Sequence, residues 1–332
     1  MNKLFVTFMV IMGIVVLHSF SNSNAYYKTG DVISLHRHTV GNGIAVVIIG
    51  DGFDREDCRK DGVYEYNCQK LTELFLSMPV IRDFKDYFDV FARVDVSQER
   101  GARNCVDTPD NCPDNAYGSG HPDLNWDKIE ENATLATGGK TDRSIIFMAN
   151  GMIGGHVINN IAIYSANEPN KAYWMMHEFA GHVLGHFPDL YYITGEAPVQ
   201  ESTKAAFDHG HGIGEFLMFE WRDDPKEVYW KDFIGQSGYE MVGVYPAAYW
   251  DLKFGSMFSC ENIFTSVMYG LESPRYTVME RYQLWRFIQQ RAGFTTVTID
   301  EFKKYDVVNL KETDWSWNRY KEWTDDRIWN GK

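Results

Sequence analysis

Apolar runs and polar stretches alternate along the chain in a pattern that mixes strands with helices. A β-branched run over residues 44–49, bounded by glycines, predicts a buried strand. An aromatic, alternating run over 87–96 predicts a second strand, and residues 144–148 and 159–164 predict a third and a fourth. A helical pattern over 69–76 lies between the first two strands. Strands and helices interleaved in this way favour an α/β or α+β domain over an all-β sandwich.

The first 25 residues have the pattern of a signal peptide. A basic start leads into an apolar run over residues 4–17, and small and polar residues then end at Ala25. The apolar run is shorter than the roughly 20 residues that a membrane-spanning helix needs, so a retained anchor is the weaker alternative. We therefore expect cleavage of residues 1–25 and a secreted or periplasmic protein that has no membrane contact after signal cleavage.

Residues 26–332 contain no internal repeat, low-complexity tract or composition break that would mark a second domain. We expect a single domain that ends in a helical segment, and a monomer. The formal net charge of −14 argues against nucleic acid and anionic lipid as partners, because both are themselves negatively charged. Polypeptide and neutral glycan remain as partner classes.

The five cysteines leave two interpretations open for an exported chain. Cys58 with Cys68, and Cys105 with Cys112, are close enough in sequence to form two local disulfides, which would leave Cys260 unpaired. Alternatively, all five are buried thiols. No pair has the CxxC spacing of a zinc or redox site, so the cysteines offer no candidate for chemistry.

The candidate metal-binding and catalytic side chains are concentrated in residues 177–189, which read HEFAGHVLGHFPD. Three of the chain's ten histidines, one glutamate and one aspartate fall within these thirteen residues. This density indicates a metal site rather than core filling. A helix is predicted to begin near Pro169 or Asn170 and to carry the first histidines. Gly185 and then Pro188 should end this helix and let the chain return toward the metal.

The spacing of the histidines predicts a local π-turn. His177 and His182 are five residues apart, and in a regular α-helix they would differ by about 140° around the axis, too far to share one ion. A π-type turn around residues 179–182 absorbs the extra residue, and Gly181 lowers the steric cost of this distortion.

A second ligand set requires no distortion of the helix. Glu178, His182 and His186 are spaced by four residues and would share one face of a regular α-helix. This set leaves His177 unused, consumes Glu178 as a ligand, and requires the helix to continue through Gly185. It is therefore the weaker alternative.

The segment HEFAGHVLGHFPDLYY resembles the extended signature of the IgA-peptidase-like family of secreted bacterial zinc peptidases, which are of the metzincin type. The resemblance implies His177, His182 and Asp189 as Zn²⁺ ligands, and it implies Glu178 as the catalytic base. Leu190 departs from the family pattern, which usually has an acidic residue at that place.

Further segments extend the resemblance in weaker form. Residues 266–270, SVMYG, resemble the methionine turn that lies beneath the metal in metzincins, with Met268 as the methionine. Asn150 and the pair Gly154 and Gly155 precede the metal helix as in the family, where the glycines lead into an edge strand beside the cleft. The implied fold is α/β (α+β), a metzincin-like domain with a twisted mixed sheet, an active-site helix and a methionine turn.

Together these residues predict a secreted zinc metallo-endopeptidase that acts on polypeptide. Two imidazoles and a carboxylate leave a fourth zinc position for water, and Glu178 can take a proton from that water and return it to the leaving amine. Candidate oxyanion donors, chosen by proximity to the motifs, are Tyr191, Tyr192, Tyr269 and Tyr276. Two alternatives stay open: a non-catalytic glycan- or protein-binding module on a peptidase fold, and a zinc amidase or deacetylase.

Two other features are weaker candidates for ligand binding. His209 and His211 could form a second metal site, although exposed histidines in a glycine-rich loop are the simpler interpretation. Residues 107–114 offer oxygen ligands for calcium but lack the glycine and the terminal glutamate of an EF-hand, so a solvated loop is favoured.

Overall fold

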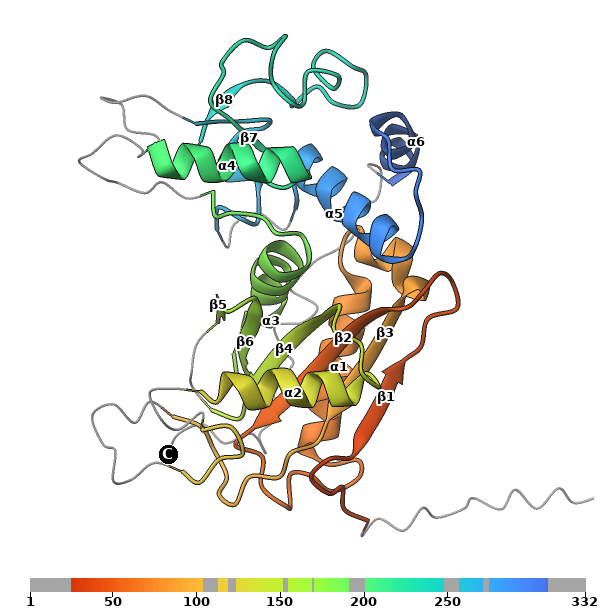
Figure 1. Ribbon diagram of the computed structural model, residues 1–332, viewed down its shortest axis with the longest axis vertical. Helices are drawn as coiled ribbons and strands as arrows, with labels where there is room; N and C mark the ends of the chain where they lie inside the picture. The colour runs from red at the N-terminus through yellow and green to blue at the C-terminus, as the bar shows by residue number, and fades with distance from the viewer. Residues whose placement is uncertain are drawn as a thin grey trace, which may run out of the picture.

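The computed structural model describes residues 25–103, 113–118, 124–151, 155–168, 170–190, 201–247, 257–270 and 275–309. These residues form a mixed α/β structure built on a six-stranded mixed sheet, and a separate three-stranded sheet lies at the opposite end of the molecule (Figure 1). The fold class expected from the sequence is confirmed at this level.

The large sheet has parallel strands at its centre and antiparallel strands at both edges. Its order is β1-β3-β2-β4-β6-β5. Strands β3, β2, β4 and β6 run parallel, whereas β1 is antiparallel to β3 and β5 is antiparallel to β6. The six strands are β1 (Val32–His36), β2 (Ile44–Asp51), β3 (Phe88–Arg93), β4 (Arg143–Ala149), β5 (His156–Ile158) and β6 (Ile161–Ser165).

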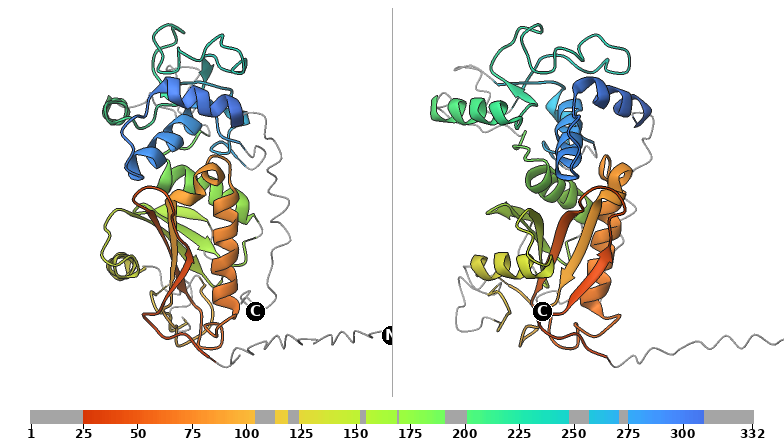
Figure 2. Two further views of the ribbon diagram at one scale, coloured as in Figure 1. Left: turned by 90° about the vertical axis from the view of Figure 1, so that its right-hand side faces the viewer. Right: turned by 45° about the vertical axis from the view of Figure 1, so that its right-hand side comes forward.

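Helices cover both faces of this sheet. Helix α1 (Val63–Ser77) lies on one face and α2 (Trp126–Ala136) on the other, as the edge-on view in Figure 2 shows. The remaining elements are η1 (Ile81–Tyr87), α3 (Lys171–Trp174), η3 (Met175–Leu184), α4 (Glu201–Ile213), β7 (Phe219–Glu220), β8 (Tyr245–Pro246), β9 (Phe258–Ser259), η4 (Ile263–Thr265), α5 (Val278–Arg291) and α6 (Ile299–Asn309). The continuous helix of α3 and η3 lies between the large sheet and the group formed by α4 and α5 (Figure 1).

Strand β2 shows why the sheet is covered on both sides. All eight of its residues are buried, as expected for a central parallel strand. Because side chains alternate along a strand, Val46 and Ile48 pack in the core with α1 and η3, whereas Val47 and Ile49 pack with α2. The uninterrupted apolar run in the sequence therefore serves two separate cores.

The predicted strands are confirmed, with shifts of a few residues at their ends. The predicted helix over 69–76 is longer than expected, because α1 begins at Val63. Strand β1 was not predicted from the sequence, whereas β5 directly follows Gly155 and is the edge strand that the family resemblance implied. β5 reaches β6 through a tight turn in which Asn159 and Asn160 have φ of 51° and 60°, a left-handed conformation that asparagine tolerates well.

The cysteines that the structure describes are buried thiols. Cys58, Cys68 and Cys260 are all free, so the local disulfide between the first two is not formed. Burial raises the pKa of the Cys58 thiol to about 12, which makes it a poor nucleophile. Cys105 and Cys112 lie outside the described residues.

Within the described ranges, no helix has both the length and the apolar character needed to cross a bilayer. The predicted signal peptide lies outside these ranges except for Ala25, and so does the chain beyond Asn309.

Candidate metal centre

The metal motif lies on a π-helix. After the single turn of α3, residues Met175–Leu184 form the π-helix η3. The backbone N–H of Gly185 donates to the carbonyl of Ala180, five residues earlier, at 3.0 Å. This confirms the predicted π-turn, and the distortion is longer than the predicted residues 179–182. Hydrogen bonds between residues five apart bring His177 and His182 to the same side of the helix.

Three side-chain atoms converge at one point. Nε2 of His177 lies 3.0 Å from Oδ1 of Asp189, and Nε2 of His182 lies 3.3 Å from each of these two atoms. Tetrahedral zinc with ligands at about 2.0 to 2.1 Å requires ligand atoms roughly 3.3 Å apart. The spacing of these three donors therefore fits one zinc ion.

The proton positions on the imidazoles also fit a cation. Nδ1 of His177 lies 3.0 Å from the carbonyl oxygen of Val267, and Nδ1 of His182 lies 2.6 Å from that of Phe187. A carbonyl only accepts, so each Nδ1 carries the proton and each Nε2 presents a lone pair. Two lone pairs and the carboxylate of Asp189 thus face one another within contact distance, an arrangement that a cation stabilises.

The charge of Asp189 acts in the same direction. Burial disfavours a charged His182, but the hydrogen bond to Asp189 and its negative charge outweigh burial and raise the pKa of the imidazole. The site therefore attracts positive charge, which zinc would provide.

Glu178 lies beside the three ligand atoms without joining them. Its Oε2 is 4.0 Å from Nε2 of His182, and the residue is 6% exposed. Burial raises the pKa of its carboxyl group, opposed by the nearby His177 and His182. A carboxylate with a raised pKa, next to the metal position, has the placement and basicity of a general base.

The segment expected to form a methionine turn, residues 266–270, packs against helix η3. A Cβ on Gly181 would lie 2.5 Å from the sulfur of Met268, so this side chain occupies the space that a larger residue at 181 would need. The backbone N–H of Leu190 donates to the carbonyl of Met268 at 3.0 Å. Leu190 itself is 1% exposed. A buried apolar side chain therefore stands where the family pattern has an acidic residue.

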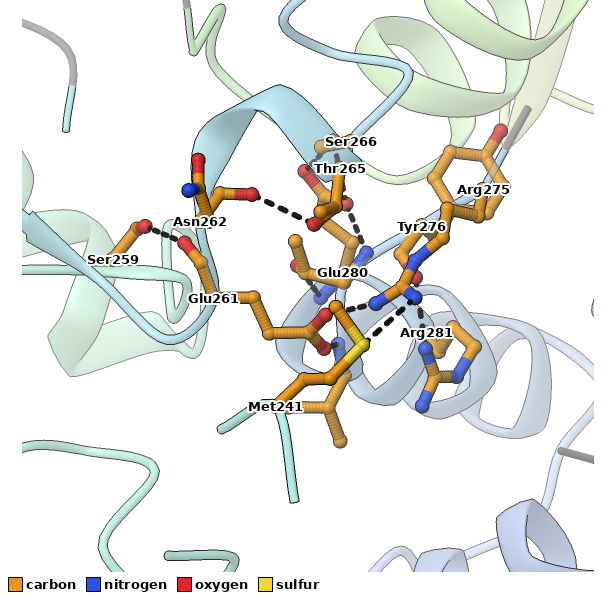
Figure 3. Close-up of polar contacts among 12 residues, drawn as sticks. Met241, Ser259, Glu261, Asn262, Thr265, Ser266, Arg275, Tyr276, Glu280 and Arg281 are labelled. Atoms are coloured by element: carbon orange, nitrogen blue, oxygen red, sulfur yellow. Dashed lines mark hydrogen bonds and ion pairs between the residues drawn. The ribbon is translucent and has the colours of Figure 1, made fainter. Parts of the chain in front are cut away.

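A buried polar network supports this turn (Figure 3). The hydroxyl of Ser266 donates to Glu280 at 2.8 Å and accepts from the backbone N–H of Met268 at 3.0 Å. Glu280 also accepts from the N–H of Thr277, closing a capping box at the start of α5. Burial raises the pKa of Glu280 to about 7. The first turn of α5 is thereby linked by hydrogen bonds to residues 266–268.

The alternative ligand set is not brought together. His186 follows the end of the helix with φ of 54°, and its Nδ1 lies 3.0 Å from Oε1 of Glu215. Among the described residues, one group of His, Cys, Asp and Glu has the geometry to hold a metal ion, and it consists of His177, His182 and Asp189.

The two proposed oxyanion donors that the structure describes, Tyr269 and Tyr276, do not line the cavity. The hydroxyl of the buried Tyr276 donates to the carbonyl of Met176 at 2.7 Å, so this contact stabilises helix η3. The ring of Tyr269 packs against Phe264, at 4.6 Å between centroids. Tyr191 and Tyr192 lie outside the described residues.

A different tyrosine, Tyr173, reaches the site and was missed from the sequence. Its hydroxyl lies 3.2 Å from Nδ1 of His177. Burial, with the charges of Glu178 and Asp189, raises its pKa to about 12, so it remains a neutral phenol. Its position four residues before His177, within the predicted helix, is the sequence signal that could have identified it.

A cavity of about 730 Å³ opens over these residues. Its walls come from the edge strand β5, the metal helix and the segment after α4. The lining residues are Gly155, His156, Val157, Tyr173, Trp174, His177, Glu178, His182, His186, Phe187, Asp189, Glu215 and Phe216. A cavity of this size accommodates a segment of polypeptide or a small ligand.

The weaker candidates gain no support. His211 is 8% exposed, and its Nε2 lies 3.1 Å from the carbonyl oxygen of Phe216, so it satisfies local backbone. Most of residues 107–114 lie outside the described ranges.

Comparison with known proteins does not assign the chain to a family. A scan against protein-family models finds no match for the chain, and a search of curated proteins finds none either. The resemblance described above therefore depends on the motif residues themselves.

Proposed function

We propose that the chain is a zinc-dependent metallo-endopeptidase that acts on polypeptide outside the cytoplasm. The observation that carries the proposal is the convergence of His177, His182 and Asp189 at 3.0 to 3.3 Å, with two lone pairs and one carboxylate facing a single point. The adjacent Glu178 adds the base that hydrolysis needs.

When bound, zinc supplies Lewis acidity toward water and toward a substrate carbonyl. The chain's own residues do the rest. Glu178 accepts a proton at its carboxylate as water attacks the peptide carbon, and then delivers this proton to the departing amine. The carbonyls of Val267 and Phe187 hold the two imidazoles in the tautomer that leaves Nε2 available. Tyr173 contacts His177 and helps to orient its ring.

Glu178 is also the observation that favours an enzyme over a binding module. A carboxylate buried next to a metal position is costly to keep, because burial disfavours its charge. A module that only binds glycan or protein has no use for this group. The zinc amidase or deacetylase alternative shares the same chemistry and differs in substrate.

The decisive experiment is digestion of a denatured protein and a peptide library by the exported, zinc-loaded chain, read by mass spectrometry. We expect new peptide termini that disappear when a chelator is added and return with Zn²⁺. An amidase or deacetylase would leave peptide bonds intact and cleave an amide of another kind of substrate. A binding module would cleave neither peptide bonds nor these other amides.

A further inference from the structure

One wall of the cavity is not used by the proposed chemistry. It consists of His186 and Phe187, which follow the metal helix, and of Glu215 and Phe216, which follow α4. His186 and Phe216 both have positive φ, 54° and 55°, although neither is a glycine. Such backbone conformations cost free energy and persist where surrounding contacts impose them.

Side chains of helix α5 hold both of these chain segments in place by hydrogen bonds. The fully buried amide of Gln283 donates to the carbonyl of Gly185 at 2.6 Å and accepts from the N–H of Leu217 at 3.1 Å. One turn further along α5, Arg286 donates to the carbonyls of Gly214 and Ile213 at 3.0 and 3.2 Å. The two chain segments are thus fixed to the same helix, and Glu215 is held between these attachment points.

The fixed position gives Glu215 a defined place in the wall. Its side chain is 22% exposed, and Oε1 is 3.0 Å from Nδ1 of His186, whose ring packs against Phe287. The contact with His186 is made by Oε1, and the partly exposed carboxylate of Glu215 lines the cavity. The guanidinium group of Arg286 donates to the backbone carbonyls of Gly214 and Ile213 rather than to the carboxylate of Glu215.

The charges of the cavity favour a cationic ligand. Three carboxylates line it, from Glu178, Asp189 and Glu215, against the two positive charges that a zinc ion would bring. Burial lowers the pKa of His156 on the opposite wall, so that imidazole is neutral at neutral pH. Glu215 is the carboxylate of the cavity that stands apart from the three converging ligand atoms and from Glu178 beside them.

We propose that Glu215 is a specificity-determining residue that selects a lysine or arginine side chain of the polypeptide substrate, next to the peptide bond at the metal. The inference rests on the proposed function. The aliphatic stem of such a side chain packs against the ring of Phe216, and its charged end pairs with Glu215. A carboxylate discriminates a cation from a neutral amide of similar length by about tenfold in affinity.

The test measures binding in a background that cannot turn over. Zinc-loaded Glu178→Gln protein is immobilised, and a library of short blocked peptides is selected on it and read by mass spectrometry. We expect lysine and arginine to be enriched at one position. Calorimetry on the best peptide and its arginine-to-glutamine counterpart should give a preference of about tenfold, which falls to about unity in the double variant Glu178→Gln, Glu215→Gln.

Glu131→Gln is the matched control, because it removes the same charge from an exposed site on α2, on the other face of the sheet. The double variant Glu178→Gln, Glu131→Gln should keep the preference. Absence of basic enrichment at every position, absence of peptide binding, or an unchanged preference without Glu215 would each overturn the inference. The proposed function fails separately, when wild-type protein shows no chelator-sensitive cleavage in the digest.

Discussion

Gly181 and Met268 lie close together where helix η3 meets residues 266–270, so that a Cβ at 181 would lie 2.5 Å from the sulfur. Gly181→Ala should therefore force the turn away from the helix. We expect a loss of about 1 to 3 kcal/mol in the free energy of unfolding, measured by denaturant titration, together with weaker zinc binding.

Gly212 provides the control for that substitution, because a Cβ there meets nothing within 4 Å and the residue lies in helix α4. Gly212→Ala should be neutral or slightly stabilising. Adding Met268→Ala to Gly181→Ala should recover part of the lost zinc affinity by removing the clash. If Gly181→Ala alone leaves both stability and zinc affinity unchanged, the contact does not constrain the site.

Glu178→Gln should abolish hydrolysis and leave zinc bound, since the proton acceptor is lost while the three ligand atoms are untouched. We expect a fall of about a hundredfold to ten-thousandfold in kcat/KM, with full zinc content by elemental analysis. Glu131→Gln serves again as the charge-matched control. Loss of zinc in Glu178→Gln would make Glu178 a ligand and remove its role as base.

Zinc content should separate the two ligand sets. His177→Ala and Asp189→Ala should lose the metal, because each removes one of the converging atoms. His186→Ala should keep it, because His186 faces Glu215 instead. Zinc retained in His177→Ala but lost in His186→Ala would establish the alternative set of Glu178, His182 and His186.

The raised pKa of Glu280 predicts a specific pH dependence of stability. Burial raises the folded pKa of this carboxyl group to about 7 from its ordinary 4.5, so between these pH values the folded state holds a proton that the unfolded state has released. Stability contributed by this group is therefore present below about pH 4.5 and is lost as pH rises through about 7. Wild type should lose unfolding free energy over this range, by denaturant titration, relative to Glu280→Gln.

Glutamine at position 280 keeps the capping-box geometry with Thr277 and removes the titration, so the difference between the two proteins isolates the carboxyl group. Parallel curves for the two proteins between pH 5 and about pH 7 would show that Glu280 carries no linked proton.

The site was predictable from the sequence to the extent that it is local. The five-residue spacing of His177 and His182 defined the π-helix, because two ligands on one helix must face the same ion. Asp189 is near enough in sequence for the chain turn at Gly185 to bring it back. The apolar run of β2 was likewise sufficient to predict a buried strand.

The features that the sequence did not reveal depend on distant segments. Strand β1 lies at the edge of the sheet and none of its residues is fully buried, so its sequence lacks the apolar run of a central strand. The role of Tyr276 depends on a hydrogen bond to Met176, 100 residues away. The pair of His186 and Glu215 exists because Gln283 holds both segments, and no local pattern contains that information.

Each of the two imidazoles contacts a main-chain carbonyl, that of Val267 or of Phe187, and Tyr173 adds a side-chain contact at His177. Every residue type has a main-chain carbonyl oxygen. These two contacts therefore depend on the path of the backbone and not on which residue types stand at positions 267 and 187. Engineers can therefore redesign those side chains to reshape the surroundings of the site, as long as the replacements preserve the path of the backbone.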